Sequence, residues 1–202
     1  NSSETPTVEK SSQTLKEVQS NPIFWIYSLS LSIHALFGTA LVFHIVSIFE
    51  EAGKGRAEAF SYFIPAAIFS TLSNLFASWM SDKINLKPIL IIMLISFCIG
   101  SLGFIYLINS WGFWLLAFGF GVGGGLWGVI SNLAIIRFFG SKHLGEISGL
   151  STSFNVVASA IGPAAFSLGF DYFGSYAAPA KICLIVIVIL LLTAIFLEQK
   201  ED

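Results

Sequence analysis

Charged residues are scarce in this sequence. They make up 11% of its 202 residues, against about a quarter in an ordinary soluble domain, so the chain lacks the charged surface that a water-soluble core of this size needs. Cysteines are rarer still: the sequence has two, Cys98 and Cys183, and both lie in apolar runs. This excludes a disulfide framework and a cysteine-based metal cluster. The net charge of −2 gives no support for nucleic-acid binding. No metal site and no cofactor is expected.

Apolar residues, in contrast, are abundant. They make up 55% of the chain, and the mean hydropathy is +0.81. A helix needs about 20 consecutive apolar residues to cross a bilayer. Residues 88–136 contain no charged residue and are too long for one helix, so Asn109-Ser110 is expected to separate two. The sequence therefore predicts an all-α membrane protein with six transmembrane helices, at about residues 24–49, 59–80, 88–108, 111–136, 147–170 and 177–197.

The two ends of the chain are polar. Residues 1–21 lack the apolar core of a signal peptide and are expected to form a flexible cytoplasmic linker before the bundle at residues 22–197. Residues 198–202 are expected to form a short cytoplasmic tail. The lysine and arginine count sets the orientation. Three of these residues fall on one side of the membrane, and seven fall on the side that holds both termini. Both termini are therefore expected in the cytoplasm. The seven residues are Lys10, Lys16, Lys83, Lys87, Arg137, Lys142 and Lys200.

Polar residues recur at helical spacing in four of the six runs. The runs 88–108 and 177–197 are apolar nearly all round and are expected to face lipid. The clearest polar stripe is Ser148, Thr152, Asn155, Ser159 and Gly162, with steps of four and three residues. Small and hydroxyl residues can serve helix packing. The alternative is a polar surface that the first, second, fourth and fifth helices share.

This order of features resembles the C-terminal half of a major facilitator superfamily transporter. In that family the third and sixth helices of each half are peripheral, the first and fourth line the cavity, and the second and fifth meet the other half. Residues 78–87 (SWMSDKINLK) resemble the loop signature Gly-x-x-x-Asp-Arg-x-Gly-Arg-Arg. Asp82, Lys83 and Lys87 match in type, whereas positions 78, 85 and 86 depart. Gly162-Pro163 resembles the Gly-Pro bend of the fifth and eleventh helices.

Within the superfamily the chain looks most similar to the oxalate/formate and monocarboxylate-transporter-like branch, on Phe24-Trp25 and the loop at Arg137. Monocarboxylate transporters carry Asp and Arg where this chain has Ser70 and Asn74. Oxalate exchangers carry a lysine in the fifth helix, which this chain lacks. An anionic substrate requires a buried cation. Either the other half supplies that cation, or the substrate is not a carboxylate.

The resemblance implies secondary active transport of a small solute, an organic anion or another small metabolite, by alternating access. It implies a multi-pass protein of a bacterial inner membrane, not an enzyme. Its partners would be the lipid bilayer, the N-terminal six-helix half of the same transporter, and the solute. The residues expected to line the cavity are His34, Phe37, Leu41, Ser70, Asn74, Trp127, Ser131 and Asn155.

Charged residues near the helix ends are candidates for a gate. Besides Lys83 and Lys87 of the loop signature, Asp82 is expected to act as a latch on a neighbouring helix N-terminus or as a plain helix cap. Arg137 and Glu146 are expected to form an ion pair or to lie separately in solvent.

His34 is the histidine deepest in a predicted helix. Histidine titrates near neutral pH, which suits proton coupling, and the alternative is a packing role. An intramembrane protease is disfavoured because no catalytic Ser–His pair is apparent. A six-helix channel, or a homo-oligomeric carrier that acts without a second half, is the alternative class.

Overall fold

A computed structural model describes residues 13–199; the rest of the predicted linker and tail, including Lys10 and Lys200, lies outside the described residues. Six helical stretches are long and apolar enough to cross a membrane, which confirms the predicted fold class. All regular elements in the described part are helices: α1 (Leu15–Gln19), α2 (Pro22–Phe43), α3 (Ile45–Glu51), α4 (Arg56–Ser61), α5 (Phe63–Ser81), α6 (Leu86–Ile105), α7 (Ser110–Phe139), α8 (Leu144–Phe173) and α9 (Ala177–Phe196).

The short helix α1 lies inside the range expected to be a flexible linker. The backbone N–H and the hydroxyl of Thr14 donate to the Glu17 carboxylate at 2.7 and 2.8 Å, which caps the helix. These two hydrogen bonds hold the pKa of Glu17 below its ordinary value, and the bond from the backbone N–H has the larger effect. Val18 is fully buried and docks α1 onto the bundle.

Helix ends follow local sequence signals. The Asn21 side chain accepts a hydrogen bond from the Ile23 N–H at 2.9 Å, and Pro22 occupies the first helical position of α2. Gly174 has a φ of +70° and ends α8 in the left-handed conformation. The first predicted helix, at 24–49, consists of two helices, because the helical conformation is interrupted at His44, between α2 and α3.

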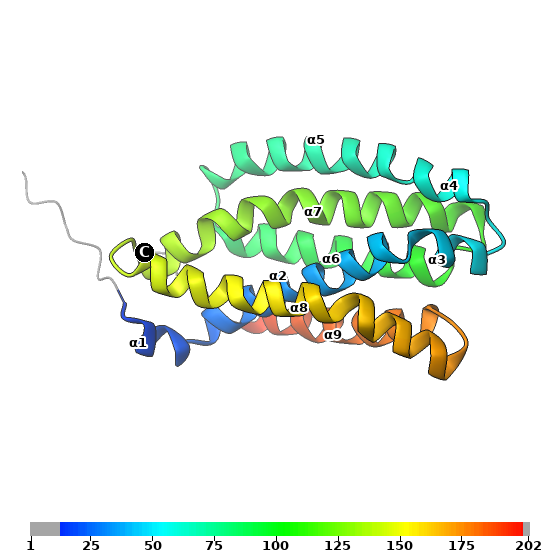
Figure 1. Ribbon diagram of the computed structural model, residues 1–202. Coiled ribbons are helices and arrows are strands. Elements are labelled where there is room, and N and C mark those ends of the chain that lie inside the picture. The colour runs from blue at the N-terminus through cyan, green and yellow to red at the C-terminus, as the bar shows by residue number, and fades with distance from the viewer. Residues whose placement is uncertain (1–12, 200–202) are drawn as a thin grey trace, which may run out of the picture.

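The six long stretches form one bundle. In Figure 1, the face of the bundle turned toward the viewer is formed by α5, α7, α2 and α8, which lie side by side. The helices α6 and α9 lie behind them. The helix α7 packs most extensively against α5 and α6, and α2 packs most extensively against α8. The core contains a cluster of aromatic rings, Phe37, Phe104, Phe120 and Phe166. We call the side formed by α5, α7, α2 and α8 the open face.

The back helices expose apolar side chains, as expected for contact with lipid. In α6 these include Ile92, Ile95 and Leu102, although α6 also buries much of its length against α7 and α9. The two edge helices of the open face are the least buried stretches of the bundle. They also expose large apolar residues, among them Ile68 and Leu72 of α5.

Candidate functional site

A cavity of about 670 Å³ opens between α2, α7 and α8. Its volume falls in the usual range for small-molecule sites, about 300–1,000 Å³. No charged residue lines it, and seven of its lining residues carry a hydroxyl or an amide beside the rings of Tyr27 and Trp127. The wall consists of Tyr27, Leu31, Ala35, Trp127, Ser131, Asn132, Ala134, Ile135, Ser148, Ser151, Thr152, Asn155, Val156, Ser159 and Ala160.

The polar stripe of α8 supplies one side of this cavity. Ser148, Thr152, Asn155 and Ser159 all line it, because residues three and four apart share one face of a helix. The helix α8 is anchored to α2 here by two hydrogen bonds. The Ser28 hydroxyl donates to the Ser151 hydroxyl at 3.0 Å, and the Ser32 hydroxyl donates to the Asn155 side-chain carbonyl at 3.2 Å.

Three of the residues expected to line a cavity do so: Trp127, Ser131 and Asn155. The Trp127 indole N–H donates to the backbone carbonyl of Leu31 at 3.1 Å, which ties α7 to α2. The Ser131 hydroxyl donates to the carbonyl of Gly128 within α7 at 3.0 Å. Each of these side chains is therefore held in place by a backbone or side-chain partner.

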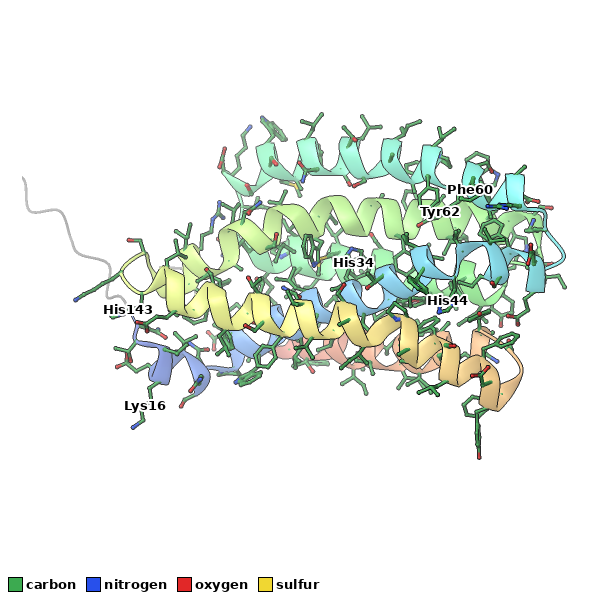
Figure 2. All side chains as sticks on the ribbon, viewed as in Figure 1. Lys16, His34, His44, Phe60, Tyr62 and His143 are labelled. Carbon is green, nitrogen blue, oxygen red and sulfur yellow. The ribbon has the colours of Figure 1, made fainter. Side chains whose placement is uncertain are left out.

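His34 does not line this cavity, although its ring lies 5.7 Å from the ring of Trp127, which does. Figure 2 shows it about midway along the bundle, between α2 and α7. Its imidazole stacks on the Phe97 ring of α6, with centroids 4.5 Å apart and planes 6° apart. It is brought close to the cavity but not into it.

Phe37 and Leu41, by contrast, lie in the closed core. Both are 0% exposed, and the Phe37 ring lies 4.8 to 5.3 Å from the rings of Phe104, Phe120 and Phe166. The physical reason is that α6, α7 and α8 direct aromatic rings at this turn of α2. The structure therefore places these two residues away from the cavity wall.

Ser70 and Asn74 lie at the contact between α5 and α7. The Asn74 side-chain amide donates to the backbone carbonyl of Gly125 at 3.0 Å, and the Ser73 hydroxyl donates to the carbonyl of Val122 at 3.2 Å. Asn74 also borders a smaller cavity of about 360 Å³, together with Asp82. Neither of these two predicted residues lines the larger cavity.

The loop-signature residues lie between α5 and α6. Asp82 follows the last residue of α5 and is exposed. The Lys83 ammonium lies 3.6 Å above the centre of the Trp79 ring, in cation–π geometry. The Lys87 ammonium donates to the carbonyls of Ile195 and Leu197 at 2.9 and 2.8 Å, where it stabilises the C-terminal end of α9.

Arg137, at the end of α7, binds the same loop. Its guanidinium donates to the carbonyl of Ser81 at 2.5 Å and to the carbonyl of Ile84 at 3.3 Å. Glu146 is exposed in the first turn of α8. The planar guanidinium has several donors and so bridges carbonyls on both sides of the turn after α5.

Gly162 and Pro163 lie where α8 crosses α2. Gly162 is buried, and a Cβ there would collide with the Leu36 carbonyl group, whose carbon would be 3.0 Å away. Pro163 has no N–H to donate to the Ser159 carbonyl one turn earlier, and Ser159 lines the cavity. The Pro163 carbonyl lies 3.0 Å from Nε2 of His44.

A family model for the Major Facilitator Superfamily matches residues 1–163 and, separately, residues 59–202. These two matches together cover the chain. The chain belongs to the Major Facilitator Superfamily. No curated protein matches it. Members of the Major Facilitator Superfamily are transporters rather than enzymes, so the chain is a multi-pass membrane protein of a transporter family.

A polar cluster that no sequence pattern indicated lies at one end of this Major Facilitator Superfamily bundle. The hydroxyl of Tyr176 lies 3.4 Å from Nδ1 of His44. The Glu51 carboxylate accepts from the Ser175 hydroxyl at 2.5 Å and from the Tyr176 N–H at 3.0 Å. These contacts join the break after α2 to the bend of α8 and the start of α9. The residues are up to 132 positions apart, so no local pattern could reveal them.

Proposed function

We propose that this chain forms one half of a secondary active transporter that moves a small solute by alternating access. The observation that carries the proposal is the uncharged but polar cavity of about 670 Å³ in an otherwise apolar bundle. A polar surface inside a membrane bundle costs free energy unless it serves packing or a solute. The cavity is large enough to take a small metabolite.

The proposed partner is an N-terminal six-helix half of the same transporter. It would cover the open face, of which α5 and α8 are the edge helices (Figure 1). Both helices expose apolar side chains. Secondary transporters place their solute site at such an interface between repeats. Lipid would cover the apolar sides of α6 and α9.

We also propose that both termini lie in the cytoplasm of a bacterium, with the bundle in its inner membrane. The loops after α5 and α7 lie at the same end of the bundle as α1 (Figure 1). Lys83, Lys87, Arg137 and Lys142 lie in or beside these loops. Such a positive bias marks the cytoplasmic side.

The solute is proposed to be an organic anion or another small metabolite. The cavity lining contributed by this chain has no cation, so a carboxylate would need one from the other half. A six-helix channel or a homo-oligomeric carrier is the second candidate, because the exposed apolar residues of α5 and α8 could equally pack against further copies of the chain.

Uptake into proteoliposomes tests the proposal. The full-length transporter and this chain alone would be compared with a panel of carboxylates and uncharged metabolites, with and without a pH gradient. We expect uptake by the full-length protein only. Asn155→Leu should lower that uptake because it removes a polar group from the cavity wall, whereas Ser153→Ala, on an exposed position of α8, should not. Saturable uptake by this chain alone would favour the homo-oligomeric carrier.

A further inference from the structure

The imidazole of His34 has one closed edge and one open edge. Its faces pack against aromatic rings, with Phe97 stacked at 4.5 Å and Phe120 at 6.3 Å. Its Nδ1 is buried and has no hydrogen-bond partner among residues 13–199. Nε2 also has no hydrogen-bond partner in this part of the chain, but unlike Nδ1 it is not a fully buried atom. The Nε2 edge is therefore the part of the ring that can meet a ligand.

Two glycines leave this edge uncovered. A Cβ on Gly124 of α7 would lie 3.9 Å from both Cε1 and Nε2 of His34 and 3.9 Å from the hydroxyl oxygen of Ser70. A Cβ on Gly38 of α2 would lie 3.7 Å from Cε1 and 4.0 Å from Nε2. These are ordinary contact distances, so each glycine leaves open the volume that a methyl group would occupy. The gap is bounded by α2, α5 and α7.

The neighbouring Gly125 has no such open space beside it, so the gap at Gly124 is not shared by every glycine of α7. A Cβ on Gly125 would lie 2.9 Å from the backbone nitrogen of Asn74 and would collide with α5. Gly125 therefore serves the close approach of α5 and α7. Gly124, one residue earlier, faces an imidazole and a hydroxyl across open volume instead.

The surroundings of His34 favour a neutral imidazole. Of the charged groups on the packed helices α2, α5, α6 and α7, Lys87 and Arg137 lie near helix ends, and Asp82 directly follows α5. Cys98, next to Phe97 in α6, is neutral as a thiol. An imidazolium here would be a buried charge with no counter-ion in the described part of the chain, which is costly.

A neutral imidazole carries a single N–H. A buried N–H without an acceptor is less favourable than a buried lone pair without a donor. Since Nδ1 is enclosed without a partner, the proton is better placed on Nε2, where it points toward the open edge.

We propose that the Nε2–H of His34 and the hydroxyl of Ser70 form a hydrogen-bonding subsite that takes an uncharged carbonyl or hydroxyl group of the transported solute. The gap at Gly124 admits that group. The subsite rests on the proposed transport function and deepens it. It assigns His34 to solute recognition as a hydrogen-bond donor, and it makes an uncharged polar solute the substrate class that this half recognises.

Nitrogen-15 NMR of the histidine-labelled protein in lipid nanodiscs tests the donor state without any solute. The sequence has three histidines, so the His34 signals can be assigned by their loss in His34→Phe. We expect a neutral imidazole protonated on Nε2 at pH 7. A doubly protonated His34, or a neutral form protonated on Nδ1, would overturn the assignment.

Uptake by the full-length transporter tests the solute class, with lactamide, glycerol and glucose as uncharged probes and lactate and oxalate as anionic probes. We expect an uncharged probe to be taken up. Gly124→Ala should raise its KM about tenfold, because one hydrogen bond is lost. The matched control is Gly149→Ala, which adds the same methyl group on α8 where no atom lies within 4 Å.

Substitutions of His34 separate a donor from a proton carrier. His34→Gln keeps an N–H donor, so it should retain most of the affinity, whereas His34→Phe keeps only the ring stacking and should lose about tenfold. Equal losses in both variants together with loss of pH-driven uptake, or uptake of anionic probes only, would overturn the proposal. If no probe is transported at all, the proposed function fails, and the NMR result still decides the donor state.

Discussion

The side-chain amide of Asn74 donates a hydrogen bond to the backbone carbonyl of Gly125 at 3.0 Å and so joins α5 to α7. Glycine allows this approach, because a Cβ on Gly121, one turn earlier, would lie 2.7 Å from the carbonyl oxygen of Ala66. A polar side chain in the membrane is here satisfied by the backbone of the neighbouring helix, which is the packing role that small and polar residues have in membrane bundles.

Asn74→Leu keeps the size of this side chain and removes its donor. We expect the free energy of unfolding to fall by about 0.6–2 kcal/mol, the range measured for hydrogen bonds between membrane helices. Reversible unfolding in sodium dodecyl sulfate, followed by circular dichroism, would measure it. Thr71→Val, at an exposed position of α5, is the control and should change little. Equal losses in the two variants would contradict the role of the hydrogen bond.

Gly162→Ala should separate α8 from α2. The added Cβ would collide with the Leu36 carbonyl. Such overpacking lowers the free energy of unfolding by about 1–3 kcal/mol. The same unfolding assay would measure the loss. Gly149→Ala meets no atom within 4 Å and should not destabilise the protein, since alanine is the better helix former. A similar loss in this control would show that the collision with Leu36 is not the cause.

Arg137→Lys should loosen the loop between α5 and α6. A lysine ammonium is a single point charge and cannot bridge the carbonyls of Ser81 and Ile84 as the guanidinium does. We expect hydrogen exchange at residues 82–86 to become about tenfold faster, as measured by mass spectrometry. Lys142→Ala, at an exposed position of the next loop, should leave that exchange unchanged. Unchanged protection in Arg137→Lys would show that the loop is held by other contacts.

Glu51→Ala should loosen the start of α9. The carboxylate accepts from the Ser175 hydroxyl and from the Tyr176 N–H, a capping arrangement that contributes about 1 kcal/mol. Faster hydrogen exchange in the first turn of α9, detected by mass spectrometry, is the expected result. Glu50→Ala removes the neighbouring exposed carboxylate and should have no effect there. If both variants behave alike, the effect is one of charge only.

The cap of α1 should depend on pH through Glu17. Its hydrogen bonds to Thr14 lower the pKa of the carboxyl in the folded protein, so folding is favoured by the ionised form. This contribution is fully present above the unfolded pKa of about 4.3 and is lost as the pH falls through the lower folded value. Amide exchange of α1 should therefore become faster in acid. Glu17→Gln should remove this pH dependence; if the dependence remains, another group causes it.

The number of candidate membrane-crossing helices among the described residues could be predicted from the sequence. The lengths of the apolar runs predicted six membrane-crossing helices, and the structure contains six. The spacing of Ser148, Thr152, Asn155 and Ser159 also predicted a common face, and these residues line one cavity. Both properties are local, because bilayer thickness fixes the length of a crossing helix and the helical repeat fixes which residues share a face.

Tertiary packing decided what each helix face contacts. His34, Phe37 and Leu41 recur along one helix, yet Phe37 and Leu41 are enclosed, whereas the Nε2 edge of His34 faces the gap at Gly124. Arg137 binds backbone carbonyls that lie 53 and 56 residues earlier in the chain. The sequence by itself determined how many helices cross the membrane and which of their faces are polar. Only the tertiary structure decided which polar face is satisfied by a neighbouring helix and which remains open, because that depends on side chains contributed by distant segments.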